Sequence, residues 1–441
     1  MNSASATQRG MRDFLLIWFG QLVSGVGSRL TSFALGLWVY QTTGSTTRFA
    51  LVFVAMAIPA LLLLPFAGAL VDRWDRRRIM IVCECVSALA IGGMALLAAF
   101  GELQLWHVYL GVGITAMTNT FLQPAYAASV PLLADREQLT RVNALIQTGQ
   151  GVALVGGPAL AGILMSLMGI VGVLVVDALT FLVGALCIAL ARIPRPVRDQ
   201  ATEGSLLTEA REGLRYVTER PGLLGLLGIS AAGGFLFAIA SIAITPLVLI
   251  VANQDERLLG MQMSLSCSGL LVGGVLIALW GGPRHKIHGL LGFSALSGLA
   301  IAAHGLAPSL TLLIVAGFLM FLTIPPAQSA SMTLWQIKVP SQMLGRCMAM
   351  LRMTSEAALP IGYLLAGPLA EFVFEPAMMP GGVLADSVGA VIGTGPGRGL
   401  ALMFIVLGLS MTMVAVAGYA VRSIRRVEHE LPDAPLPAVV A

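Results

Sequence analysis

The chain has 441 residues, of which 57% are hydrophobic and only 11% are charged. Soluble domains average about 25% charged residues, so this composition excludes a soluble enzyme of ordinary make-up. The net charge of +4 is too small to indicate a nucleic-acid partner.

Apolar segments long enough to cross a lipid bilayer recur along the chain. The first six are expected at roughly 14–39, 48–70, 79–100, 105–131, 142–167 and 169–191. The second six are expected at roughly 223–251, 258–280, 289–306, 309–335, 343–373 and 399–421. We therefore predict an all-α integral membrane protein with twelve transmembrane helices.

A polar connection divides these spans into two halves. We expect an N-terminal six-helix bundle over residues 1–192, a C-terminal one over 222–422, and a disordered cytoplasmic tail over 423–441. Apolar residues recur at helical spacing in the linker, 193–221, which indicates a short amphipathic helix on the cytoplasmic surface. These residues are Leu206, Leu207, Ala210, Leu214 and Val217.

The distribution of basic residues predicts the orientation. With a cytoplasmic N-terminus, 21 of the 26 basic residues fall on cytoplasmic segments, and only Arg48, Arg257 and Arg398 fall on outer ones. A missing or misplaced helix would scramble this asymmetry from that point onward. We therefore expect both termini in the cytoplasm.

A dense cluster of charges from Gly68 to Arg78 separates spans two and three. Its spacing, G-x-L-x-D-R-x-x-R-R, resembles the loop between helices two and three in the major facilitator superfamily of secondary transporters. Asp75 stands where that motif usually has glycine. The resemblance implies two pseudo-symmetric six-helix bundles with substrate bound between them near the bilayer midplane. An internal repeat agrees with it, because Pro124-Ala125 aligns with Pro326-Ala327 at an offset of 202.

In that superfamily the loop is a conformational latch. The resemblance carries this role over to Gly68, Asp72, Arg73, Arg76 and Arg77. Asp72 ends span two at the cytoplasmic face, where span eleven begins. A partly buried carboxylate at a helix N-terminus contributes up to about 1–2 kcal/mol to stability. Asp72 is therefore expected to hold the two halves together on the cytoplasmic side, which favours an outward-open state.

The sequence contains no phosphate-binding G-x-x-x-x-G-K-[ST] segment and no nucleophile, acid–base or metal-ligand constellation of recognisable spacing. We therefore expect neither an enzyme nor a cofactor. A coupled ion gradient is the natural energy source for transport by such a chain.

Ionisable residues well inside predicted spans are costly unless they are paired or face water, and Arg29, Asp177, Arg352 and Glu356 are the candidates of this kind. In one interpretation Glu356 or Asp177 carries a proton while an arginine modulates its acidity. In the other, Arg29 neutralises Asp177 and Arg352 neutralises Glu356, which fixes helix rotation. Glu84 is expected to be a structural partner of the loop arginines.

Uncharged polar residues in spans four and five indicate a substrate cavity: Asn119, Gln123, Tyr126, Gln147 and Gln150. The alternative is interhelical hydrogen bonding. Span five also carries Gly157, Pro158 and Gly162. These resemble the G-P-x-x-G-G element of exporters in the superfamily, with Ala161 in place of the first glycine of the final pair, and they favour efflux over uptake.

Further segments are similar to macrolide-efflux-like drug:proton antiporters, and enterobactin-type siderophore exporters are related. The segments include Gly20-Gln21, 37–40, 177–181, 280–283, 374–378 and 393–399. Span four lacks the arginine of the R-x-x-Q-G motif that serves proton coupling in classical drug antiporters. Coupling therefore falls to Glu356 or Asp177.

The resulting hypothesis is a monomeric efflux permease of a bacterial inner membrane. It exports a small amphipathic drug or secondary metabolite, such as a macrolide or a siderophore, by alternating access and proton antiport. The alternatives are an importer of a small solute and a membrane sensor that transports nothing.

Overall fold

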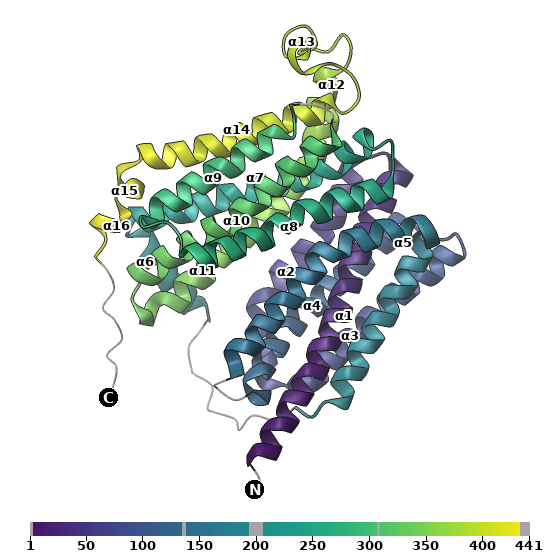
Figure 1. Ribbon diagram of the computed structural model, residues 1–441, viewed down its shortest axis with the longest axis vertical. Coiled ribbons are helices and arrows are strands. Elements are labelled where there is room, and N and C mark those ends of the chain that lie inside the picture. The colour runs from purple at the N-terminus through teal and green to yellow at the C-terminus, as the bar shows by residue number, and fades with distance from the viewer. Residues whose placement is uncertain (1–2, 135–137, 194–205, 307–308, 433–441) are drawn as a thin grey trace. The chain divides into compact units, whose positions relative to one another are not determined.

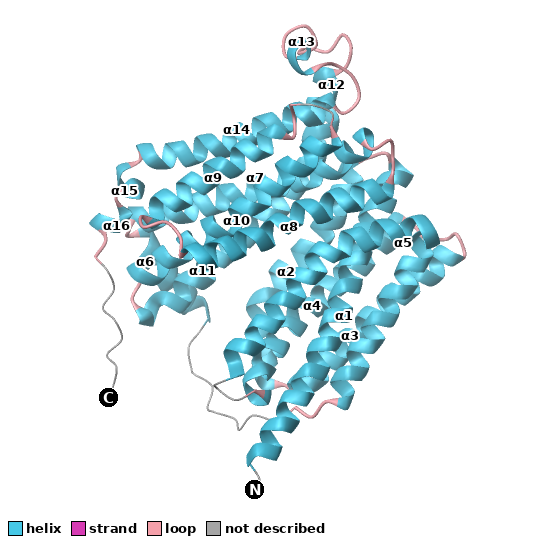
Figure 2. Cartoon of the chain, viewed as in Figure 1, coloured by secondary structure: helices cyan, strands magenta, loops and turns pink. Residues whose placement is uncertain are grey.

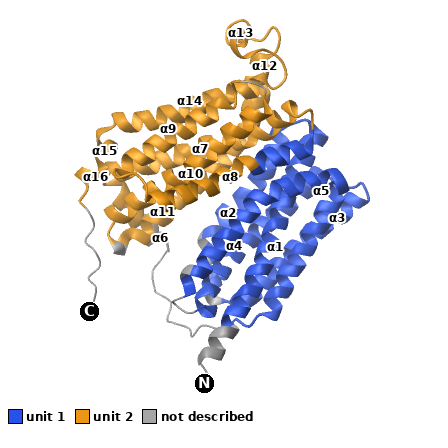
Figure 3. Ribbon diagram, in the orientation of Figure 1, with its two compact units in different colours: residues 1–199, 255–264 blue, residues 200–254, 265–441 orange. Residues whose placement is uncertain are grey.

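The computed structural model describes residues 3–134, 138–193, 206–306 and 309–432. In this part of the chain every regular element is a helix, as Figures 1 and 2 show. The chain forms two compact units (Figure 3): unit 1 comprises residues 1–199 and 255–264, and unit 2 comprises 200–254 and 265–441. The predicted all-α membrane fold is confirmed.

Unit 1 is built from five long helices. They are α1 (Ser3–Thr43), α2 (Thr46–Arg73), α3 (Arg76–Ala99), α4 (Leu105–Leu133) and α5 (Leu139–Leu190). The first residues of α8 (Glu256–Trp280), up to 264, also belong to this unit. Two apolar clusters form its core, one around Phe14 and Met80 and one around Leu35 and Leu174.

Helix α5 contains two of the predicted spans. Gly169 interrupts it with φ 65° and ψ −171°, a backbone conformation that glycine adopts at little cost because it has no Cβ. The expected boundary between spans five and six lies at the same place. The chain thus passes from one span into the next without a connecting loop.

Ten helices of the described chain are long and apolar enough to cross a membrane. Helix α5 counts once among them although it holds two predicted spans, and α4, which occupies the fourth predicted span, is not among them. The second half of α4 contains Asn119 and Gln123, which lower the hydropathy of the helix. A polar face on a spanning helix is a sign of contact with water or protein rather than lipid.

Unit 2 contains the remaining helices. They are α6 (Leu206–Thr218), α7 (Pro221–Val251), the rest of α8, α9 (Lys286–Ala303), α10 (Leu310–Lys338), α11 (Ser341–Pro368), a π-helical turn (Leu369–Phe374), α12 (Glu375–Met378), α13 (Gly389–Ile392), α14 (Arg398–Ala420), α15 (Arg422–Arg425) and α16 (Val427–Glu430). One apolar cluster around Leu223, Leu291 and Trp335 forms the core near one end of this unit.

The start of the C-terminal tail is ordered, which corrects the expectation of disorder over 423–441. Residues up to 432 are described, and α15 and α16 pack against α7 and α9 through Ile424 and Val427. Glu428 accepts hydrogen bonds from the backbone N–H groups of Lys286, at 2.5 Å, and Ile287, at 3.2 Å, at the first turn of α9. Residues 433–441 lie outside the described part.

Candidate functional site

The turn between α2 and α3 is fixed by its charged residues. Asp75 caps α3 by accepting hydrogen bonds from the N–H groups of Arg77, at 3.1 Å, and Arg78, at 3.3 Å. A short acceptor at this position satisfies N–H groups that have no partner within the helix. This explains why an aspartate can replace the glycine expected from the loop motif.

Two arginines of the same turn bind the ends of other helices in unit 1. Arg76 donates to the carbonyl of Ala128 on α4 at 2.7 Å. Arg77 donates to the carbonyls of Ile188, at 3.2 Å, and Ala189 near the end of α5. Cations at helix C-termini meet carbonyl oxygens that lack an intrahelical donor. Gly68 lies within α2, and the side chains of Asp72 and Arg73 lie outside the described part.

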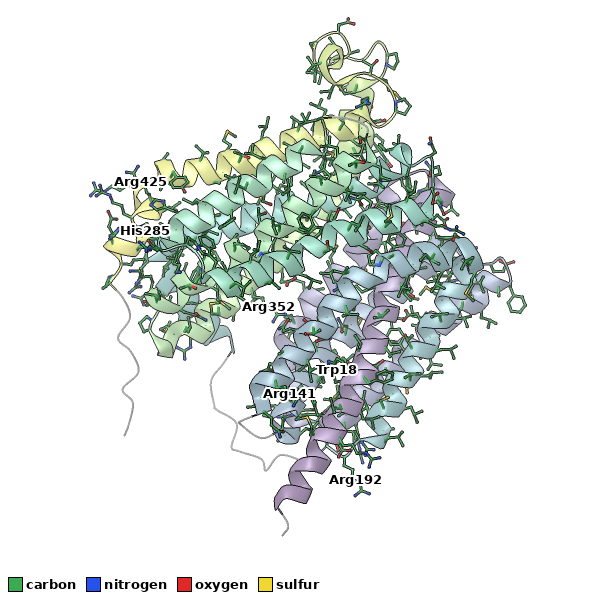
Figure 4. All side chains as sticks on the ribbon, in the orientation of Figure 1. Trp18, Arg141, Arg192, His285, Arg352 and Arg425 are labelled. Atoms are coloured by element: carbon green, nitrogen blue, oxygen red, sulfur yellow. The ribbon has the colours of Figure 1, made fainter. Side chains whose placement is uncertain are left out.

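Basic residues gather at one end of unit 1. Arg141 and Arg192, from the start and the end of α5, both lie towards the end where α1 begins (Figure 4). Arg77 contacts the same end of α5, and Arg76 contacts α4. In unit 2, His285 and Arg425 lie together at one end, near α15 and α16 (Figure 4). This grouping is the pattern that the positive-inside rule describes.

Polar side chains on α4 and α5 are exposed within apolar helices. They are Asn119, Gln123, Gln147 and Gln150. In the described chain these four side chains form one hydrogen bond, from Gln123 Nε2 to Asn119 Oδ1 on the same helix, at 3.3 Å. The alternative of interhelical hydrogen bonding is therefore not seen for these four residues in the described chain. Tyr126 differs from the prediction, because it is only 7% exposed and packs in the apolar cluster around Phe14.

The two expected ion pairs are absent from the described residues. Arg29 is exposed, and its stem packs against Gly157, where an added Cβ would lie 2.6 Å from Arg29 Cβ. Asp177 instead accepts a hydrogen bond from the Thr180 hydroxyl at 3.1 Å. Arg352, labelled on α11 in Figure 4, and Glu356 are both exposed and form no ion pair.

Glu84 is the functional candidate that sequence reasoning missed. It is 1% exposed and accepts hydrogen bonds from Gln21 Nε2 at 2.6 Å and Ser24 Oγ at 3.0 Å, both on α1. None of the loop arginines whose side chains the structure describes binds it; Arg76 and Arg77 bind helix carbonyls instead. The sequence does contain a sign of its importance, because Glu84 is the one ionised residue between Ile79 and Phe100.

The glycine-rich element of α5 packs against the start of α8 within unit 1. A Cβ at Gly162 would lie 2.5 Å from the Glu256 carbonyl oxygen, and one at Gly260 would overlap the Pro158 carbonyl. Arg257 Nε donates to Ser166 Oγ at 2.8 Å, and Gln41 Nε2 donates to Glu256 Oε1 at 2.8 Å. The missing side chains thus allow close helix approach, which polar contacts then reinforce.

Helix α6 is bound to α11 within unit 2. Arg346 of α11 forms an ion pair with Glu212 of α6 at 2.5 Å, and Gly213 lies against Arg346. Arg220 stacks over the Tyr216 ring, 3.6 Å from its centroid. Burial raises the pKa of the Tyr216 phenol, and the nearby Arg220 opposes this effect.

A family model describing the Major Facilitator Superfamily matches residues 17–363. The chain belongs to this superfamily. Its membership and the observed helices make it a multi-pass membrane transporter rather than an enzyme.

Among curated relatives, the chain is similar to macrolide efflux protein A of Streptococcus pyogenes. The two are 27% identical over 365 residues, which is 81% of this chain and 89% of the relative. It is also 27% identical to the multidrug efflux pump Tap of Mycolicibacterium fortuitum, over 83% of this chain and 90% of that protein.

Solved structures share the fold at lower identity. A bacterial homologue of the human lysosomal transporter Spinster, in an inward-facing, unoccupied conformation, superposes with a TM-score of 0.71 at 15% identity, covering 95% of this chain and 98% of that one. The nucleoside transporter NupG matches with a TM-score of 0.67 at 13% identity, covering 92% and 98%.

Proposed function

We propose that this member of the superfamily exports a small amphipathic compound across a bacterial inner membrane. The observation that carries the proposal is similarity over four fifths of the chain to two proteins named for efflux. The exporter-like element at Gly157, Pro158 and Gly162 supports the same direction. Drugs such as macrolides are the first compounds to test, and secreted metabolites such as siderophores come second.

The exposed polar side chains of unit 1 are the proposed substrate contacts. Asn119, Gln123, Gln147 and Gln150 supply amide donors and acceptors on helices that are otherwise apolar. An amphipathic compound needs a few polar partners within a largely apolar surface. Arg29 lies exposed beside Gly157 and can attract an anionic group. In unit 2, Arg352 and Glu356 offer charges on one face of α11.

The proposed energy source is a proton gradient, with Asp177 as a proton carrier. A proton needs a group that can exist both charged and neutral within the membrane, and a buried carboxyl without a cationic partner meets this requirement. The grouping of basic residues at one end of each unit supports cytoplasmic termini. We take the working unit to be a monomer.

The α2–α3 turn is the proposed conformational latch. Arg76 and Arg77 hold the turn against α4 and α5, so the backbone that presents Asp72 is fixed in place. Loss of the Asp72 charge is expected to change the balance between transport states while the unit stays folded.

A susceptibility panel in an efflux-deficient host tests the export proposal. Cells that make the wild-type chain should tolerate more of at least one amphipathic compound and should accumulate less of it when it is labelled. Asp72→Asn should lose this protection at an unchanged protein level. Accumulation of a labelled solute above the empty-vector control would instead indicate an importer, and absence of flux in proteoliposomes would leave the sensor alternative.

A further inference from the structure

Two helices of unit 1 meet along a line of small residues, which we call the α1–α5 seam. It consists of Gly20, Ser24, Gly27 and Thr31 on α1 and Asp177, Thr180, Gly184 and Cys187 on α5. An added Cβ at Gly20 would lie 2.7 Å from Cys187 Cβ, and one at Gly27 would overlap Asp177 and Thr180. The helices therefore approach closely along two turns.

Glu84 enters this seam from α3. A Cβ at Gly184 would lie 3.0 Å from Glu84 Cδ, so this glycine makes room for the carboxyl group. Gln21 and Ser24 donate to its two oxygens from the opposite helix. Three helices thus enclose Glu84, and Asp177 stands about two helical turns before Gly184 on the same face of α5.

Both carboxyl groups lack a cationic partner. Glu84 and Asp177 are each 1% exposed, and no basic side chain in the described chain binds either of them. Their donors are a neutral amide and neutral hydroxyls. A carboxylate removed from water without a cation is strongly disfavoured, and two neighbouring ones oppose each other's ionisation. The pair is therefore expected to hold at least one proton.

Other titratable groups around the pair cannot neutralise it. Cys83 on α3 and Cys187 on α5 interact with Glu84, and both are neutral as thiols. From α1 the facing groups are Gln21, Ser24 and Thr31, which do not titrate. The charged head of Arg29 is exposed instead of facing Asp177.

An acceptor remains open at this place. Asp177 Oδ2 and Thr31 Oγ1 are both buried, and the Thr31 hydroxyl interacts with the Asp177 carboxyl group, although neither atom meets strict hydrogen-bond geometry in the described chain. In contrast, both oxygens of Glu84 are occupied by donors. Buried polar atoms in native proteins are nearly always satisfied. A proton on Asp177 Oδ2 would turn this oxygen into a donor, for which the Thr31 hydroxyl oxygen is an acceptor.

We propose that Glu84 and Asp177 form a two-carboxyl proton site in the α1–α5 seam, with Asp177 Oδ2 as the atom that binds and releases the proton. This proposal rests on the proposed proton antiport and adds the second carboxyl group and its place. When the proton leaves, the carboxylate must gain water, so the tightly packed seam has to open. When a proton returns to the carboxylate, the seam can close again. Protonation is thereby linked to the packing of α1, which also carries Arg29.

The experiment compares matched neutral variants in proteoliposomes. Glu84→Gln and Asp177→Asn keep the side-chain size and fix the uncharged form, and Glu102→Gln removes an exposed carboxyl group in a loop as the control. An outward-directed substrate flux driven by a pH gradient should fall about tenfold or more in both seam variants. Exchange of labelled for unlabelled substrate, which needs no net proton movement, should persist in them. Glu102→Gln should behave as the wild type in both assays.

Infrared spectroscopy tests the site without transport. The absorption of buried protonated carboxyl groups should be present in the purified wild type near neutral pH, and each seam variant should lose part of it. Unaltered absorption in both variants would overturn the proposal, as would gradient-driven flux equal to wild type in both. If the wild type itself shows no flux driven by the gradient, the proposed antiport fails, and the infrared result still decides whether the carboxyl pair holds a proton.

Discussion

The two units surround their buried ionisable groups differently. In the α1–α5 seam of unit 1, the described partners of Glu84 and Asp177 are all neutral. In unit 2, Lys338 at the end of α10 is 6% exposed, and its Nζ donates to the carbonyls of Glu428, at 2.5 Å, and Leu431, at 2.7 Å. The two carbonyl oxygens bind the Lys338 ammonium group, whereas the seam surrounds its carboxyl groups with neutral donors. The proposed proton site therefore lies in unit 1, and Lys338 acts as a structural clamp in unit 2.

The largest expected effect on stability comes from removing the Glu84 carboxyl group, which accepts two hydrogen bonds in unit 1. Glu84→Leu should lower the free energy of unfolding by about 2–4 kcal/mol, because Gln21 and Ser24 would be left as buried donors without a partner. Unfolding in mixed micelles, followed by tryptophan fluorescence, measures this loss. Glu84→Gln retains an acceptor oxygen and should lose clearly less. Equal stability of all three proteins would contradict the observed hydrogen bonds.

The corresponding change in unit 2 is Lys338→Met. It should cost about 1–3 kcal/mol, because two buried carbonyls lose a charged donor. Trypsin should then cut faster at Arg422, Arg425 and Arg426 as α15 and α16 loosen. Lys286→Met is the matched control, since among the described residues Lys286 Nζ donates to a single carbonyl, that of Pro283 at 2.9 Å. Cleavage at the same rate in both variants would rule out the clamp.

Adding a single methyl group to α1 tests how tightly the seam is packed. Gly27→Ala should destabilise by about 1–3 kcal/mol, because the new Cβ overlaps the Asp177 and Thr180 side chains. Gly25→Ala on the same helix should be neutral or slightly stabilising, since no atom lies within 4 Å of its Cβ position. The two variants are compared by thermal unfolding in detergent.

A smaller effect is expected where α6 meets α11. Arg346→Ala removes a half-exposed ion pair with Glu212, which should contribute about 0.2–1 kcal/mol. The loss should shrink further at high salt because exposed charges are screened. Melting temperatures at low and high salt provide the measurement, and a loss that grows with salt would contradict this assignment.

The smallest change in stability is expected for Glu356→Gln, below about 0.5 kcal/mol, because the side chain is exposed and unpaired. Its effect on gradient-driven flux should also be weaker than that of Asp177→Asn. Full loss of coupling in Glu356→Gln, with Asp177→Asn unaffected, would move the proton site to unit 2 and reverse the comparison.

The fold could be predicted from the sequence because apolar length and basic turns act locally. The reversal at Gly169, the amphipathic α6 and the span boundaries all follow from short stretches of chain. The seam could not be found this way, because it joins α1 to residues about 160 positions further on. Proximity in sequence pairs Glu84 with the loop arginines, yet Arg76 and Arg77 bind helix carbonyls instead. The sequence does not show whether Tyr126 lines a cavity or packs in a core, because its phenol can serve either.

The direct turn at Gly169 has a practical consequence for topology mapping. With no connector between the two halves of α5, an epitope or protease site inserted there would have to break one of the spans. The segment between α12 and α14, where Val383 and Val391 are strongly exposed, can accommodate such a tag at far less risk. Side-of-membrane experiments on this transporter should therefore begin with insertions near residue 383.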